Sequence, residues 1–411
     1  MKRMVTGIAA ACVLAFLLAQ FIRPSIPQGP AAEIHLPANV KAVLEKDCYS
    51  CHSNERRLAW FDEVQPAYWL VRKDILEARA GLNFSTIGSK PEGAQRGALY
   101  ESVAMMQLGA MPLPRYVQLH PEAKVTAEDI EIIKEYLSPW SSPIPRAATD
   151  EAGVGAPVRA GHDSVMPSPN RIPYEEDWRE WRLIAVTDRG DNRQFRMILG
   201  NDVAVKAARE GNVHPWPDGA KFAKIAWWQQ QRADGLVVPG AFFQIEMMIK
   251  DAQRFRDSDG WGWARWRGVD LKPYGKDATF VQECTGCHLP MRGNDYVYTQ
   301  PFSASIVAGD EVVNNAAVRM PQGLSFNPLD WAPVTMYSDP QRHTISVVFA
   351  DSKEGMTAAA SGSAQAVVTW TERDDPHWFG ARVADRVVSV ETAAADGRSG
   401  FIAGSQPAQI P

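Results

Sequence analysis

Apolar side chains fill the start of the chain almost without a break and then give way to shorter, patterned runs. The unbroken run extends from Met4 to Phe21, and Lys2 and Arg3 precede it. A basic start followed by such a run is typical of an export signal, and about 18 apolar residues are just long enough to cross a bilayer as a helix. We find no clear small-x-small cleavage site before residues 20–23, so residues 1–30 are predicted to form an uncleaved signal anchor and a tether, and a signal peptide that is removed is the alternative. The expected location is the periplasm, anchored to the inner membrane.

The region that follows, residues 31–138, has the apolar spacing of a small all-α domain. Val40, Val43 and Leu44 lie at the spacing of one helix face. Near the end of the region, the sequence Thr-Ala-Glu-Asp at 126–129 resembles a helix-opening capping box and precedes further apolar residues at helical spacing. We therefore predict one helix before residue 48 and another that closes the domain.

Residues 139–175 are rich in Pro, Gly, Ser and Ala and are predicted to form a linker. Beyond them the pattern changes to short apolar or alternating runs, whose β-branched and aromatic content favours antiparallel strands. The runs are Trp181–Val186, Phe195–Leu199, Phe222–Trp228, Ala241–Ile249 and Trp261–Trp266. The predicted fold is α+β and multidomain, with an all-α domain followed by a β-rich domain at residues 176–305.

Residues 306–411 weakly repeat that β-rich domain. The echoes are Arg196–Asp202 in Ile345–Asp351, Lys224–Trp227 in Val367–Trp370, and Gln244–Glu246 in Ser389–Glu391. The second copy contains no cysteine. We predict that it forms a second, structural β unit without a haem.

Four of the five cysteines stand in two C-x-x-C-H motifs, Cys48–His52 and Cys284–His288. A zinc site would need further ligands at matching spacing, and a thioredoxin-like pair would require neither the His nor a second copy. Two thiols one short turn apart can bond both vinyl groups of a haem, and the adjacent His can bind the iron.

The motifs therefore predict two covalently bound haem c groups. The expected attachment residues are Cys48, Cys51, Cys284 and Cys287, with His52 and His288 as iron ligands. The formal net charge is −5 and no long basic run occurs, which argues against nucleic acid as a partner.

The all-α region resembles a small haem-binding domain found in exported bacterial proteins. The resemblance rests on residues 43–55, which include the first motif, and on the Met-Pro segment at 109–116. In such domains a Met of this segment is the sixth iron ligand, which implies Met111. Met105 and Met106 are rivals, and the alternative is a Met that merely fills a gap in the core.

Residues of about 178–305 resemble cytochrome P-460. The matching pieces are Arg179-Glu180-Trp181, Asp218-Gly219 with Lys224, Glu246 with Lys250–Phe255, and the second C-x-x-C-H motif. The resemblance implies a β-rich fold with one five-coordinate haem c and a lysine cross-linked to the porphyrin. It also implies oxidation of hydroxylamine, whereas a related branch without the lysine, cytochrome c-prime-beta, binds gases such as nitric oxide.

By this resemblance Lys224 is the cross-linking lysine, Glu246 a distal-pocket carboxylate and Arg196 a pocket-side arginine, with Lys221 as a rival for the cross-link. Each could instead be an ordinary solvated or ion-paired strand residue. No Met stands at a convincing distal position, which agrees with an open iron site. In an apolar, aromatic pocket Glu246 would have a raised pKa and would suit proton transfer.

We therefore predict a periplasmic dihaem oxidoreductase that oxidises hydroxylamine or a similar small nitrogen compound at the second haem and passes electrons through the first. The expected partners are that substrate or a gas ligand, a soluble or membrane electron-transfer protein, and the membrane through the N-terminal helix. A homodimer is compatible with the sequence. A reductase that delivers electrons to the second haem is equally compatible with the residues. Two further alternatives stay open, a gas-binding cytochrome without turnover and a plain electron-transfer module.

Overall fold

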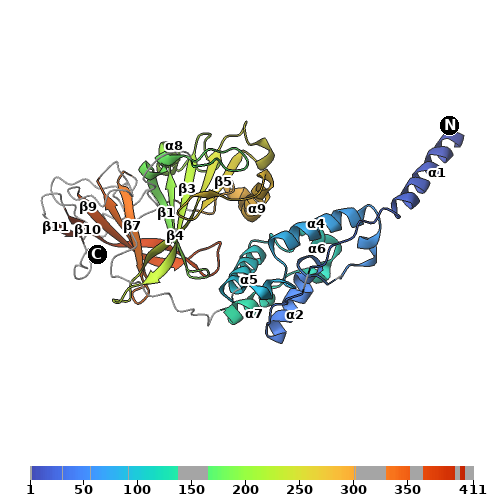
Figure 1. The fold of residues 1–411 in the computed structure, drawn as a ribbon, viewed down its shortest axis with the longest axis horizontal. Coiled ribbons are helices and arrows are strands. Elements are labelled where there is room, and N and C mark those ends of the chain that lie inside the picture. Colours follow the sequence, from blue (N-terminus) through green and yellow to red (C-terminus); the bar gives the residue numbers. More distant parts are fainter. Residues whose placement is uncertain are drawn as a thin grey trace. The chain divides into compact units, whose positions relative to one another are not determined.

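The computed structural model describes residues 2–29, 31–55, 57–90, 92–137, 165–299, 301, 330–351, 364–393 and 399–402. The chain divides into two compact units, residues 1–141 and 142–411. Figure 1 shows helices in the first unit and a strongly twisted β structure with short helices in the second. The predicted α+β fold class, with the all-α domain first, is confirmed.

The first unit contains both helices that the apolar spacing predicts. Within the described residues its α-helices are α1 (Lys2–Ala19), α2 (Ala38–Asp47), α3 (Tyr49–His52), α4 (Ala67–Gly81), α5 (Glu92–Gln107), α6 (Pro114–Leu119) and α7 (Ala127–Leu137). Helix α2 precedes the first C-x-x-C-H motif, and α7 closes the unit. Val43 and Leu44 of α2 are buried, as are Ile133 and Leu137 of α7.

The predicted capping box opens α7. The N–H of Asp129 donates to Oγ1 of Thr126 at 3.2 Å, and the N–H of Thr126 donates to Oδ2 of Asp129 at 2.7 Å. Asp129 therefore takes the place that Glu or Gln usually has in this motif. Lys46 of α2 reaches the same carboxylate at 2.6 Å, which ties the two helices together.

The predicted membrane anchor is wrong. Among the described residues, no helix is both long and apolar enough to cross a membrane. The apolar part of α1 runs from Met4 to Ala19, about 24 Å at the rise of an α-helix, whereas the hydrocarbon core of a bilayer is about 30 Å thick. The helix ends before Phe21, so the apolar run does not continue as a helix. The predicted location, in the periplasm and anchored to the inner membrane, depended on this anchor and is therefore not supported.

The Pro-rich segment after α1 lies against α4 and is not a free tether. We call its residues 22–27 the strap. Four α4 side chains donate to its backbone carbonyls: Trp69 to Ile22 (2.9 Å), Tyr68 to Pro24 (2.7 Å), Arg72 to Ser25 (2.9 Å) and Arg79 to Pro27 (2.9 Å). Between the strap and the first C-x-x-C-H turn lies a cavity of about 270 Å³, lined in part by Ile26, Ser50 and Arg79.

The second unit is built from antiparallel strands with two α-helices among its described residues. The elements are β1 (Arg182–Arg189), β2 (Gln194–Gly200), α8 (Asp202–Glu210), β3 (Lys221–Gln231), β4 (Val237–Lys250), β5 (Trp261–Arg267), β6 (Lys272–Pro273), α9 (Val281–His288), β7 (Ala332–Asp339), β8 (Thr344–Ala350), β9 (Gln365–Asp374), β10 (Ala381–Ala393) and β11 (Ser399–Ile402). The predicted strands of residues 181–266 correspond to β1–β5.

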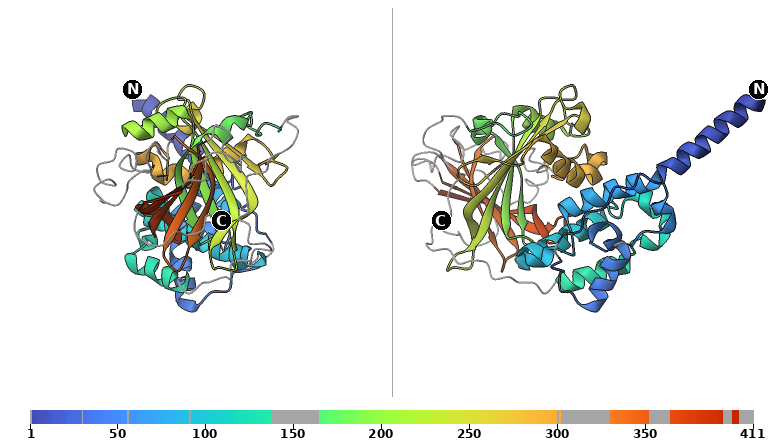
Figure 2. Two further views of the ribbon diagram at one scale, coloured as in Figure 1. Left: turned by 90° about the vertical axis from the view of Figure 1, so that its left-hand side faces the viewer. Right: turned by 45° about the vertical axis from the view of Figure 1, so that its right-hand side comes forward.

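These strands close into a barrel that uses both copies of the repeat. The order is β3-β2-β1-β10-β9-β8-β7-β4, and β4 returns to pair with β3. The copies meet where β1 pairs with β10 and where Val237 of β4 pairs with Ser338 of β7. The predicted division at residue 305 therefore separates two halves of one sheet. Figure 2 shows the same strands from two other sides.

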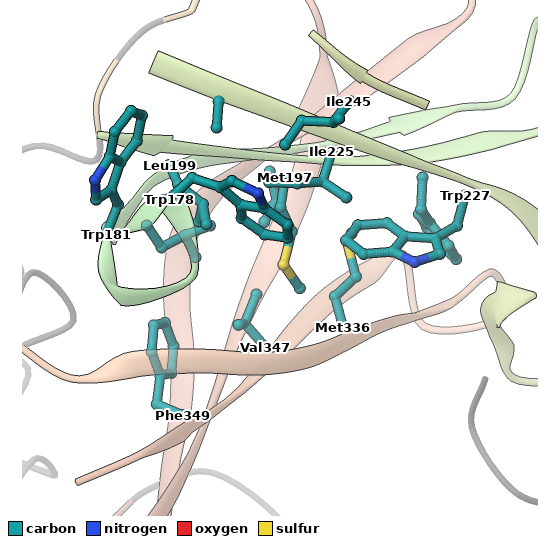
Figure 3. Packing of buried hydrophobic residues seen from close by; sticks show 14 of the residues in the cluster. Trp178, Trp181, Met197, Leu199, Ile225, Trp227, Ile245, Met336, Val347 and Phe349 are labelled. Carbon is teal, nitrogen blue, oxygen red and sulfur yellow. The ribbon is translucent and has the colours of Figure 1, made fainter. Parts of the chain in front are cut away.

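The two halves share one apolar interior. The core cluster contains Trp178, Trp227 and Trp266 from the first half together with Trp370 and Phe349 from the second. Figure 3 shows Met197, Ile225 and Trp227 facing Met336 and Val347 across this interior. Because side chains alternate along a strand, the residues between these apolar positions project from the outer face of the barrel. The predicted site residues of the second unit belong to that outer set.

Candidate functional site

Helix α9 carries the second C-x-x-C-H motif at its C-terminal end. Residues three apart on a helix share a face, so Cys284 and Cys287 can reach one ligand together. Cys284 is buried, and burial raises the pKa of its thiol to about 11. A cysteine that binds zinc does so as a thiolate. The raised pKa keeps this thiol protonated, which disfavours a zinc site and suits a thiol that becomes covalently attached.

His288 makes the kind of hydrogen bond that metal-ligating histidines commonly make. Its Nδ1 lies 2.6 Å from the backbone carbonyl of Tyr296, and burial lowers the pKa of the imidazole to about 4. A carbonyl can only accept, so Nδ1 carries the proton and Nε2 keeps its lone pair. Ligating histidines commonly have this arrangement, in which a backbone carbonyl fixes the tautomer and the ring orientation.

Lys224 and Glu246 come together on the outer face of the barrel, in a row that crosses four strands. Lys224 pairs in register with Ile198 of β2 and with Glu246 of β4, and Glu246 pairs with Arg265 of β5. Directly opposed residues of an antiparallel pair project to the same face. Lys224 contacts Oε2 of Glu246 as an ion pair, and Arg265 lies 2.7 Å from Oε1 of Glu246.

The row faces α9. The charges of Lys224, Glu246 and Arg265 all act on the pKa of His288, and those of Lys224 and Glu246 act on the pKa of Cys284. The ring of Trp263, two residues before Arg265 on β5, lies 4.5 Å from the ring of His288. The lysine and the carboxylate singled out in the sequence therefore lie beside the second motif.

The predicted rise in the pKa of Glu246 is wrong. Burial acts in that direction, but the positive charges of Lys224 and Arg265 outweigh it and hold the pKa below its ordinary value. The pKa of Lys224 is also lowered, by burial and by the like charges of Arg196 and Arg265, against the opposing charge of Glu246. Lys224 and Arg265 thus both pair with the carboxylate of Glu246, where few water molecules can reach the three side chains.

Arg196 lies on the same outer face, and Lys221 does not. Arg196 alternates with the interior residues Phe195 and Met197 on β2, and it donates to Oε1 of Gln194 at 3.1 Å. Burial lowers its pKa to about 10, and the charge of Glu246 acts on it. Lys221 pairs with Glu175 at 2.6 Å and is an odd number of residues from Lys224 along β3. The alternation of the strand therefore disfavours Lys221 as the cross-linking lysine.

Sequence reasoning missed Arg265. It stands between Ala264 and Trp266, both of which belong to the barrel core, so the alternation of β5 could have placed it on the outer face. Its pairing with Glu246 could not have been found in this way. That contact depends on the register between β4 and β5, and a one-residue slip would move it to the other face.

In the second half of the barrel, the strands pair in the same register as in the row of Lys224 and Glu246, but a valine stands in place of the lysine. Val348 pairs with Val367, and Val367 pairs with Glu391. In the first half the same places are taken by Ile198, Lys224 and Glu246. The echoes seen in the sequence between Lys224 and Val367, and between Glu246 and Glu391, therefore correspond to equivalent cross-strand pairs. The echo of Arg196–Asp202 in Ile345–Asp351 is one residue out of step with this register, because it matches Ile198 with Val347.

The residues around α9 fit a haem. His288 presents one nitrogen for iron, and the two cysteines stand on the same helix face. Arg196 Nε, Trp263 Nε1 and Arg265 Nε are buried and have no acceptor within the part of the chain that the structure describes. Donors of this kind suit a group with carboxylate acceptors, as the haem propionates are.

The first motif has an equivalent histidine. The Nδ1 of His52, on α3, lies 3.0 Å from the carbonyl of Leu82, and burial lowers the pKa of the imidazole. Burial also raises the thiol pKa of Cys48 to about 12 and that of Cys51 to about 11. His52, Cys48 and Cys51 therefore fit a haem in the same way as His288, Cys284 and Cys287 do.

The predicted sixth ligand of the first site stays a prediction. Met111 lies in the turn after α5, where its N–H donates to the carbonyl of Met105 at 3.2 Å. Its side chain is 37% exposed, whereas Met106 is buried in the helical core. Met106 therefore behaves as a core residue, and Met111 is the more exposed of the two residues.

Comparison with known protein families finds two matches. Residues 14–139 match the model of a family described as a haem-binding domain, and residues 175–299 match the model of cytochrome P460. The first match contains Cys48–His52, and the second contains Lys224, Glu246 and Cys284–His288. No curated protein matches the chain.

Proposed function

We propose that this protein is a two-haem c-type oxidoreductase that oxidises hydroxylamine or a similar small nitrogen compound. The proposal starts from the order of the two family matches, in which a haem-binding domain precedes a cytochrome P460 domain. That the protein is a haem cytochrome follows from the two family matches. The number of haems, their covalent attachment and the substrate belong to the proposal. The observation that supports it most is the placement of Lys224 and Glu246 beside His288 on one face of the barrel.

Each site has residues that can hold one haem. Cys284 and Cys287 would attach the second haem, with His288 as its iron ligand and Lys224 as the cross-linking side chain. Cys48 and Cys51 would attach the first, with His52 and Met111 as ligands. When bound, the second haem supplies an iron centre that takes electrons from the substrate.

The ion pair of Glu246 bears on proton transfer. In the structure its carboxylate is held by Lys224 and Arg265, and a carboxylate held by two cations is a weak base. A Lys224 nitrogen bonded to a carbon of a conjugated ring would be a much weaker base than a free lysine, because its lone pair is delocalised into the ring, and it would be uncharged at neutral pH. Glu246 would then keep the charges of Arg265 and Arg196 but lose that of Lys224, and its pKa would rise toward the range that general-base catalysis requires. The proposed cross-link thus also prepares the base.

The remaining residues have supporting roles in this proposal. Arg196 would place a positive charge near the substrate, and Arg265 would keep Glu246 oriented after Lys224 has been used. The first unit would pass electrons on to a soluble or membrane electron-transfer protein.

The test is an absorption spectrum of the purified holoprotein, oxidised and dithionite-reduced, beside a variant in which Cys48 and Cys51 are serine. A strongly red-shifted ferrous band that persists in the variant would support a lysine-modified second haem, and hydroxylamine turnover with a cytochrome acceptor would then establish the activity. Two ordinary ferrous c-type spectra and no turnover would sink the proposal.

Gas binding without turnover is the second candidate. The observation in its favour is the ion pair, because an unmodified Lys224 leaves Glu246 too acidic to accept protons. This candidate predicts tight nitric oxide binding to the reduced protein and no steady-state oxidation. If the second haem were instead six-coordinate and served only electron transfer, cyanide and azide would leave its spectrum unchanged.

A further inference from the structure

The segment after α9 returns to pack on the end of that helix. The carbonyl of Tyr296 accepts the Nδ1–H of His288 at 2.6 Å. Two residues later, the ring of Tyr298 lies edge-on to the ring of His288 at 5.1 Å, and its hydroxyl donates to the carbonyl of Cys287 at 2.7 Å. Tyr298 therefore touches both the imidazole and the backbone that carries it.

The far side of Tyr298 is covered by the half of the barrel that has no C-x-x-C-H motif. The rings of Trp378 and His377 lie 5.9 Å and 6.3 Å from the Tyr298 ring, and both belong to the turn between β9 and β10. That turn has a defined shape, because Oδ1 of Asp375 accepts the N–H groups of His377 at 2.8 Å and of Trp378 at 3.1 Å.

Trp378 is in turn fixed by the first half of the barrel. Its Nε1 donates to Asp191 at 3.2 Å, and the guanidinium of Arg189 lies over its ring at 4.3 Å. Arg189 and Asp191 are themselves buried and paired with each other. Backbone groups join the two turns as well, since the N–H of Asp191 donates to the carbonyl of Gly380 at 3.1 Å.

We propose that Trp378 is a positioning residue for His288 and acts through Tyr298. The line of contacts runs from His288 to Tyr298, then to Trp378, and ends on the buried Asp191. The second half of the barrel, which carries no haem motif, thereby supports the proximal side of the haem site in the first half. The inference rests on the proposed function only in taking His288 as an iron ligand.

The consequence for the iron follows from the hydrogen bond of the imidazole. A firm bond from Nδ1–H to a carbonyl makes the ring a stronger donor to its metal, and a stronger axial donor lowers the reduction potential. Without the indole, Tyr298 can turn away and the bond from His288 to Tyr296 loosens. The iron–histidine bond then weakens, and the reduction potential of the second haem rises.

The experiment compares Trp378→Ala, Trp378→Phe and wild type as two-haem holoproteins. The readouts are the iron–histidine stretching frequency of the ferrous second haem and its midpoint potential. Trp378→Ala is expected to lower the frequency and raise the potential. Trp378→Phe keeps a ring against Tyr298, so its stretching frequency and midpoint potential should stay close to the wild-type values. Trp228→Ala is the matched control, because its ring is on β3 and packs on Phe243, and it should leave both values unchanged.

The proposal is overturned if Trp378→Ala takes up haem and keeps both wild-type values. Should that variant fail to take up haem, Trp378→Leu and Tyr298→Phe carry the test, because the first removes the ring that packs on Tyr298 and the second removes the hydrogen bond from Tyr298 to Cys287. Unchanged values in both would also overturn it. A wild-type protein that does not oxidise hydroxylamine would refute the proposed function and leave these two readouts measurable.

Discussion

Lys224 and Glu246 face each other across β3 and β4, and the equivalent places in the second half of the barrel hold Val367 and Glu391. The chain therefore contains one carboxylate with a lysine opposite and one without. The pair with the lysine lies beside the helix that carries the second C-x-x-C-H motif. This difference between the two halves places the proposed chemistry at Lys224.

Replacing Lys224 with leucine should abolish hydroxylamine oxidation, with a loss of roughly 100-fold or more, and leave both haems attached. The reason is that the proposed cross-link and the base that depends on it both disappear. Steady-state turnover and the mass of the haem-loaded chain measure the two effects. Lys221→Leu is the matched control, since it removes a lysine of the same strand that pairs with Glu175. Turnover at the wild-type rate in Lys224→Leu would contradict the mechanism.

Glu246→Gln should destabilise the protein at neutral pH by about 3 kcal/mol, because Lys224 and Arg265 then lose their shared anion. The pKa of Glu246 is lowered in the fold, so its contribution to stability is present above the pKa of an ordinary glutamate, about 4.3, and is lost as the pH falls further. The difference between wild type and variant should therefore shrink on acidification.

Denaturant unfolding at several pH values measures this difference. The exposed Glu210→Gln on α8 serves as the control and should show no such dependence. A gap between wild type and Glu246→Gln that stays constant from pH 7 down to about pH 3 would argue against the ion pair.

Arg265→Gln should cost about 2 kcal/mol of stability, because a buried charged hydrogen bond to Glu246 at 2.7 Å is lost while Lys224 remains. Arg256→Gln, in the loop between β4 and β5, removes an exposed arginine. That control should change stability by less than about 0.5 kcal/mol. Equal effects of the two substitutions in denaturant unfolding would show that Arg265 does not support Glu246.

Asp188→Asn should make the stability of the barrel less sensitive to pH between about 4 and 6. Burial raises the pKa of Asp188 to about 6, although Gln229 and Ser338 donate to its carboxylate. A raised carboxyl pKa stabilises the fold fully below about pH 4 and ceases to do so as the pH passes about 6.

Asparagine resembles the protonated carboxyl. The free energy of unfolding of the variant should therefore increase by on the order of 1 kcal/mol relative to that of wild type as the pH rises through this interval. Thermal unfolding at a series of pH values shows the difference. Asp270→Asn, on an exposed turn, is the control. Parallel pH profiles for wild type and Asp188→Asn would refute the interpretation.

Local patterns in the sequence predicted the parts of the structure that depend on near neighbours. The spacing of Val43 and Leu44 predicted a helix before the first motif, and the apolar runs at residues 222–228 and 241–249 predicted the strands that carry Lys224 and Glu246. The two C-x-x-C-H motifs were evident because each is confined to five consecutive residues.

Features that depend on distant residues could not be predicted in this way. The pairing of β1 with β10 joins Thr187 to Val383, and no local pattern indicates that register. The lowered pKa of Glu246 depends on Arg265, which approaches it only through the pairing of β4 with β5. Pro-rich sequence has no periodicity to interpret, so the contacts of the strap with α4 were missed.

The closed barrel has a further consequence for how this chain can change. Every strand of the ring has a neighbour on each side, so its backbone is secured by bonds that do not depend on which side chains project outward. Substitutions on the outer face, such as the exchange of a lysine for a valine between equivalent places, therefore leave the wall intact. The half without the C-x-x-C-H motif is therefore still needed, because removing it would leave the outer edge of β1 and the start of β4 without a partner strand.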